Sequence, residues 1–144
     1  ALSFLPSPSD SADEYVKQFM DINTKYNKGA VFDNNVLVGM NAGMLTVEAL
    51  RAAGRNLTRA SLQAAIAASG STWASAGFSG LNYSKSSRVG YNGYWFGKIG
   101  LDGSMTPVDG AGKYTIYTTD SGAGAVVKSA SKRPAMPAKG LPTN

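Results

Sequence analysis

Apolar residues recur every three to four positions over residues 11–27, with charged and polar side chains between them. The apolar stripe consists of Tyr15, Val16, Phe19, Met20, Ile22 and Tyr26. This spacing predicts an amphipathic helix with one buried face. Ser11 and Glu14 are spaced as a capping box, so we expect Ser11 to cap this helix and Gly29 to follow its end.

Two further helices are predicted between residues 33 and 70. The segment that starts at residue 33 or 34 and ends at residue 53 is apolar on most of its circumference. Gly54 follows it and is suited to the end of a helix, so we expect a buried helix there. Thr58 then caps a third helix, which Gly70 ends.

The pattern changes from helical to extended after residue 71. Short strands are predicted there at residues 80–84, 91–99 and 113–119, and another at residues 2–5 near the start of the chain. Asp102-Gly103 is typical of a tight hairpin turn that leads into another strand at residues 105–108. The combination of helices and strands places the chain in the α/β class.

The basic residues are concentrated at the C-terminal end. Four of the 14 Lys and Arg residues follow the last acidic residue, Asp120. They are Lys128, Lys132, Arg133 and Lys139. Because residues 121–144 are rich in Gly, Ala, Pro and Lys and lack an apolar stripe, we expect a flexible, solvated tail that needs a neighbour to be ordered. Contact with anionic lipid headgroups or a cell-wall polymer is the alternative, and nucleic-acid binding is not expected.

The residue types exclude most familiar active sites. The sequence contains no Cys and no His, so it lacks thiolate ligands, the commonest general base and the commonest zinc ligand. Ser129 and Lys132 match a Ser-x-x-Lys pattern by letter, but their place in the basic tail favours a chance match. No carboxylate pair and no phosphate-binding glycine loop stands out. We therefore predict a non-catalytic protein without a metal or cofactor.

The chain shows no sign of membrane insertion or of a leader in its own sequence. No uninterrupted apolar run reaches about 18 residues, so we expect no membrane-spanning segment. The chain begins at Ala1 without Met and without the basic and apolar regions of a signal peptide. We expect the precursor to carry its signal peptide upstream of Ala1.

Several segments occur in an order that resembles a known family. The segment "EALRAAGRNLTRASLQAAI" is followed by "GFSGLNYS" and then by "YWFGKIGLDGSMTPV". Together they resemble the C-terminal portion of the type I periplasmic binding proteins of the branched-chain amino-acid ABC transporter family, over residues 1–109. The resemblance implies part of a two-lobed α/β fold, with helices packed on a lobe sheet and closing strands. In that fold the ligand is enclosed between two lobes by hinge bending.

The resemblance also implies a function and partners. Residues 2–5 resemble the last crossover strand, so the chain contributes part of one lobe and the hinge. The implied function is binding of a small solute, such as an amino acid, for delivery to the membrane permease of an ABC transporter. The implied partners are this small-molecule ligand, the remaining N-terminal part of the same protein and the permease. The implied location is periplasmic or extracellular, with a lipid anchor on the missing N-terminal part as one option.

The candidate ligand contacts lie within residues 32–40. Asn34 and Asn35 stand where the N-terminal end of the second helix meets a polar ligand group, although core packing explains the same positions. The resemblance adds apolar contacts from Phe32 and from Met40, which stands where relatives have an aromatic residue. Residues 110–120, an additional strand, and the tail at 121–144 lie outside the resemblance. Two alternatives stay open, a small free-standing α/β interaction domain and one chain of a processed hydrolase.

Overall fold

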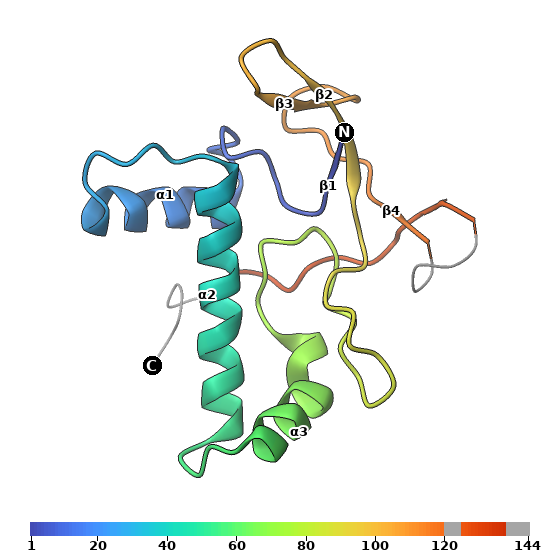
Figure 1. The fold of residues 1–144 in the computed structure, drawn as a ribbon. Helices are drawn as coiled ribbons and strands as arrows, with labels where there is room; N and C mark the ends of the chain where they lie inside the picture. The colour runs from blue at the N-terminus through green and yellow to red at the C-terminus, as the bar shows by residue number, and fades with distance from the viewer. Residues whose placement is uncertain (120–124, 138–144) are drawn as a thin grey trace.

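The computed structural model describes residues 1–119 and 125–137, and within them the chain is a mixed α/β structure. The described residues form three α-helices and two small antiparallel sheets (Figure 1). Helix α2 packs against both α1 and α3, and the β2–β3 hairpin projects from one end of the molecule. The predicted α/β content is confirmed.

Local capping signals explain where the helices begin and end. Helix α1 spans Glu14–Tyr26, α2 spans Asn34–Ala53 and α3 spans Arg59–Ser69, followed by a 3₁₀ turn at Gly70–Thr72. Thr58 caps α3 through the N–H of Ser61, and Gly54 ends α2 with a positive φ of 76°. Both features agree with the prediction, because they depend on neighbouring residues only.

The predicted cap of α1 is wrong. Asp13, not Ser11, caps the helix, and its Oδ1 accepts from the N–H groups of Tyr15 at 3.0 Å and Val16 at 3.2 Å. The chain before Asp13 is folded into turns, with the N–H of Asp13 bonded to the carbonyl of Asp10. A carboxylate at this position satisfies two N–H groups of the first turn and outcompetes the serine two residues earlier.

The first sheet has the strand order β1–β2–β3 and the second pairs β4 with β5. The strands are β1 (Leu2–Ser3), β2 (Trp95–Ile99), β3 (Met105–Pro107), β4 (Tyr117–Thr118) and β5 (Val127–Lys128). The hairpin turn at Asp102-Gly103 is confirmed, with φ of 78° at Gly103. The strand predicted at residues 80–84 is wrong. Those residues form a loop in which the N–H of Asn82 bonds to the carbonyl of Gly90.

The core lies between α1, α2 and two irregular segments. The first segment contains Leu5, and the second contains Ala74 and Ala76. Its buried apolar residues are Leu5, Tyr15, Val16, Phe19, Leu37, Met44, Ala74 and Ala76. The fully buried Asn41 of α2 ties the second irregular segment to this core. Its Oδ1 accepts from the N–H of Ala76 at 2.8 Å, and its Nδ2 donates to the Tyr91 hydroxyl at 2.5 Å.

Helix α2 is only partly buried, so the prediction of a buried helix is wrong for much of its surface. Val38 and Leu50 are exposed, and a Cβ added at Gly39 or Gly43 would meet no atom within 4 Å beyond the adjacent helix backbone. By length and composition α2 is able to cross a membrane, although core helices and signal sequences pass the same test. This property therefore assigns no location to the chain.

The described part of the predicted tail, residues 125–137, packs on the rest of the chain. Val127 and Lys128 pair with Thr118 and Tyr117. Arg133 is not solvated as predicted, because it forms an ion pair of 2.6 Å with Asp13. Lys139 and the rest of residues 138–144 lie outside the described residues, as do residues 120–124.

Candidate functional site

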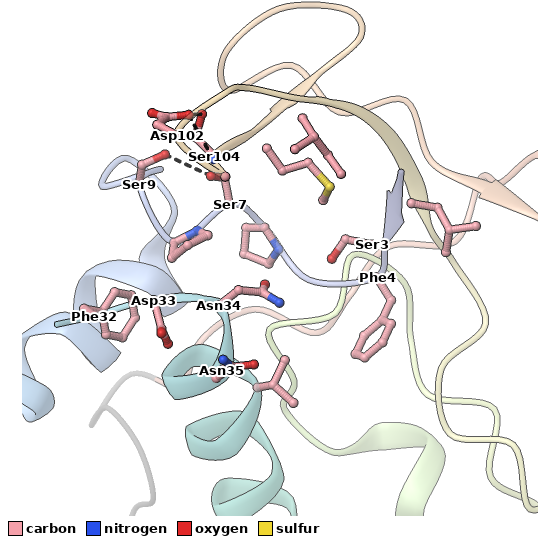
Figure 2. A pocket seen from close by; sticks show the side chains of 17 residues that line it. Ser3, Phe4, Ser7, Ser9, Phe32, Asp33, Asn34, Asn35, Asp102 and Ser104 are labelled. Atoms are coloured by element: carbon pink, nitrogen blue, oxygen red, sulfur yellow. Dashed lines mark hydrogen bonds between the residues drawn. The ribbon is translucent and has the colours of Figure 1, made fainter. Parts of the chain in front are cut away.

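A pocket of about 590 Å³ opens at the N-terminal end of α2. Three segments that are far apart in the sequence form its walls, residues 2–9, residues 32–38 and the hairpin residues 99–105 (Figure 2). Its volume falls in the range of small-molecule binding sites.

The wall formed by residues 2–9 is held by contacts with distant parts of the chain. Ser3 pairs with Trp95 across the sheet, and the Trp95 Nε1 donates to the carbonyl of Leu5 at 2.6 Å. Further along, the N–H of Ser7 donates to the Tyr114 hydroxyl at 3.1 Å. These bonds fix an extended segment that has little regular secondary structure of its own.

The second wall is the start of α2. The Asp33 carboxylate accepts from the N–H of Val36 at 2.9 Å, so the helix begins at Asn34. The side chains of Asn34 and Asn35 are exposed, while Phe32 is half-buried and packs against the core. The first N–H groups of a helix have no partner within it. This wall therefore offers amide groups and backbone donors beside an aromatic ring.

The third wall is the tip of the β2–β3 hairpin, which carries a fixed carboxylate. Asp102 accepts from the Ser104 hydroxyl at 2.7 Å and from the Ser104 N–H at 3.0 Å. The hydroxyl hydrogen bond, reinforced by the backbone one, lowers the pKa of Asp102 below its ordinary value of 3.8. The carboxylate is therefore charged at neutral pH.

The pocket combines apolar walls with negative charge. Phe4, Val38 and Ile99 supply apolar surface, and Asp33 and Asp102 supply two carboxylates. None of the described residues that line it is Lys or Arg. Such a pocket suits a small organic molecule with an apolar part and a cationic or hydrogen-bond-donating group.

Three of the four predicted ligand contacts come together here. Phe32, Asn34 and Asn35 line the pocket, whereas Met40 packs against the core and does not line it. Sequence reasoning missed Asp102 and Ser104 as pocket residues. The turn they form was visible as Asp-Gly-Ser, but its place beside α2 depends on contacts between distant segments.

A second pocket, of about 400 Å³, lies between α2 and α3 and is mainly apolar. Its walls include Trp73 and Tyr91. The Trp73 Nε1 already donates to the Ser69 hydroxyl at 3.2 Å, and the Tyr91 hydroxyl accepts from Asn41. With these polar atoms engaged, the pocket offers fewer groups to orient a ligand than the pocket at the start of α2.

Of the two residues that match the Ser-x-x-Lys pattern, Ser129 takes part in a local hydrogen bond, and no hydrogen bond within the described part of the chain joins it to Lys132. The Ser129 hydroxyl accepts from the N–H of Ser131 at 3.2 Å, and the Ser131 hydroxyl accepts from the N–H of Gly80 at 3.3 Å. Lys132 is exposed. Over residues 1–119 and 125–137, no group of three or more acidic side chains is arranged to hold a metal ion.

The chain therefore has a mixed α/β fold, and the pocket at the start of α2 is its candidate small-molecule site. No family model matches the sequence, and neither a curated protein nor a solved structure matches the chain. The resemblance to type I periplasmic binding proteins therefore stays a prediction.

Proposed function

We propose that this chain is a non-catalytic part of an extracytoplasmic solute-binding protein that delivers its ligand to the permease of an ABC transporter. The observation that supports it is the pocket at the start of α2, where Phe32, Asn34 and Asn35 meet the hairpin and residues 2–9. In this proposal the chain supplies part of one lobe and the hinge, and an N-terminal part of the same protein completes the site.

The pocket's chemistry suggests how an amino acid or a similar small compound binds. In this proposal the ammonium group faces the exposed carboxylates of Asp33 and Asp102, since opposite charges attract. The carboxylate faces the amides of Asn34 and Asn35 and the free N–H groups of the helix start. The apolar part of the ligand lies against Phe4.

One exposed sheet face supports the proposal that further protein covers this chain. Leu2 and Phe96 lie opposite each other in the register of β1 and β2, and Val108 follows β3 on the other side of Phe96. Their exposed fractions are 60%, 39% and 49%. A contiguous apolar row across three strands is typical of a surface that another element covers.

The test uses calorimetry on the complete protein with a panel of amino acids. We expect Asn34→Ala/Asn35→Ala to weaken the affinity about tenfold, because each lost hydrogen bond contributes about 0.5–1.5 kcal/mol. Asn56→Ala, an exposed asparagine beyond the other end of α2, is the matched control and should leave the affinity unchanged. Met40→Ala should lower the melting temperature and leave the affinity unchanged, because Met40 packs on the core.

Three results would contradict the proposal. An unchanged affinity in Asn34→Ala/Asn35→Ala excludes the pocket at the start of α2 as the ligand site. Micromolar binding of an amino acid to residues 1–144 alone excludes the need for a second part. If residues 1–144 are monodisperse, unfold cooperatively and bind no amino acid, a free-standing interaction domain replaces the binding-protein proposal.

A further inference from the structure

The charges are distributed unevenly along the chain. No acidic residue lies between Glu48 and Asp102. That stretch carries six cations, Arg51, Arg55, Arg59, Lys85, Arg88 and Lys98. The residues before it, 1–48, hold six acids against three cations. The six cations between Glu48 and Asp102 therefore exceed the net charge of +5 of the whole chain.

Five of these cations flank α3 at its two ends. Arg51 lies in the last turn of α2, one turn after Glu48, Arg55 lies in the turn between the two helices, and Arg59 begins α3; all three are exposed. Lys85 and Arg88, also exposed, belong to the loop after Tyr83, whose ring packs against Gly70 at the far end of α3. In Figure 1 the turn and α3 form the end of the molecule opposite the β2–β3 hairpin. We call these five residues, with the three apolar residues described next, the basic end.

Exposed aliphatic side chains lie among the cations of the basic end. Leu50 precedes Arg51, Leu57 lies between Arg55 and Arg59, and Val89 follows Arg88, with exposed fractions of 42%, 52% and 52%. A purely electrostatic surface for a soluble polyanion needs no such side chains. Cations mixed with exposed aliphatic residues match a surface that presents phosphates above hydrocarbon.

We propose that the basic end binds the surface of a membrane rich in anionic phospholipid. The guanidinium groups contact lipid phosphates, and Leu57 and Val89 enter the layer beneath them. This proposal does not depend on the solute-binding function, because it uses none of the pocket residues. The pocket lies at the other end of α2, about 30 Å away along a helix of 20 residues.

Co-sedimentation with vesicles tests the proposal. The full chain should bind vesicles of phosphatidylglycerol and phosphatidylcholine and not vesicles of phosphatidylcholine alone. Arg55→Gln/Arg59→Gln should lower the partition coefficient at least about tenfold, since each basic residue near an anionic surface contributes about 1 kcal/mol. Lys17→Gln/Lys28→Gln removes the same charge from exposed positions on and after α1 and should lower it less than about threefold.

A second variant distinguishes binding to a membrane from binding to a soluble polyanion. Leu57→Ser should weaken vesicle binding several-fold with no loss of charge, because only a bilayer receives the aliphatic side chain. Circular dichroism confirms that each variant is folded. The proposal is overturned if anionic vesicles are not bound, if the two double variants lose affinity equally, or if duplex DNA is bound as tightly as vesicles and Leu57→Ser binds like the parent chain.

Discussion

Removal of Arg133 should destabilise the fold more than removal of any other Lys or Arg in the described residues. One guanidinium nitrogen of Arg133 lies 2.6 Å from the Asp13 carboxylate, and the other donates to the carbonyl of Ala76 at 3.1 Å. The guanidinium also lies over the rings of Tyr15, at 4.6 Å, and Phe78, at 5.5 Å. Asp13 uses its second oxygen to cap α1, so the ion pair joins the C-terminal segment to the start of that helix.

The burial of the pair sets the size of the effect. The side chains of Arg133 and Asp13 are only 16% and 6% exposed. Loss of one partner of a buried pair leaves an uncompensated charge and costs about 3–5 kcal/mol. Such a loss is a large fraction of the net stability of about 5–15 kcal/mol that is typical of a domain. We expect Arg133→Met, which keeps an aliphatic stem against the two rings, to lose about 3 kcal/mol.

A double-mutant cycle isolates the ion pair from the helix cap. Asp13→Asn removes the charge and keeps a capping oxygen, because Asn caps helices as well as Asp. The double variant should be more stable than the sum of the single losses predicts, with a coupling energy of about 2 kcal/mol. The measurement is urea unfolding followed by circular dichroism, with Lys132→Met as the control, since Lys132 is exposed. Additive losses, or a loss below about 0.5 kcal/mol in Arg133→Met, refute the reasoning.

Two further predictions follow from buried and crowded positions. Burial raises the pKa of the Glu48 carboxyl above 4.5, and its Oε2 has no hydrogen-bond partner among the described residues. Because a raised folded-state pKa makes the charged form costly, Glu48→Gln should stabilise the fold at pH 7. This gain should shrink as the pH falls through the folded-state pKa towards 4.5. A pH-independent gain would contradict this. Gly97→Ala should destabilise the hairpin by about 1–3 kcal/mol, since the new Cβ would lie 2.6 Å from Met105 Cγ and 2.7 Å from Trp95 Cζ3. Gly39→Ala, which meets nothing within 4 Å, should instead raise the melting temperature, and equal effects of the two substitutions would refute the argument.

Features that depend on neighbouring residues could be predicted from the sequence. Thr58, Gly54 and the turn at Asp102-Gly103 act through bonds and dihedral angles within a few residues, and the structure has them where they were expected. Ser11 was predicted to cap α1, whereas Asp13 caps it in the structure. The turns before Asp13 account for this difference, and the sequence pattern does not reveal them.

Features that depend on distant contacts could not be predicted in this way. Residues 80–84 have the composition of a strand, but the described chain places a loop there, closed by the bond from Asn82 to Gly90. Arg133 looks like one cation in a polar tail until Asp13, 120 residues earlier, is placed beside it. The candidate pocket contains both kinds of residue, those predictable from their neighbours in sequence and those that depend on distant contacts. Asn34 was visible as a helix-start residue, whereas Asp102 joined it only through the fold of the hairpin.

Helix α2 connects the two proposed sites, and the charges at its two ends suit them. Asp33 caps the N-terminal end and Arg51 lies in the last turn, so each charge opposes the helix dipole at its end. The pocket end is negative because Asp102 lies near Asp33, and the opposite end is net positive because Arg51 and Arg55 together outweigh Glu48. A cationic group is therefore drawn to one end of α2 and an anionic surface to the other. Since 20 helical residues separate the ends by about 30 Å, more than three Debye lengths at physiological ionic strength, screening keeps the two attractions independent.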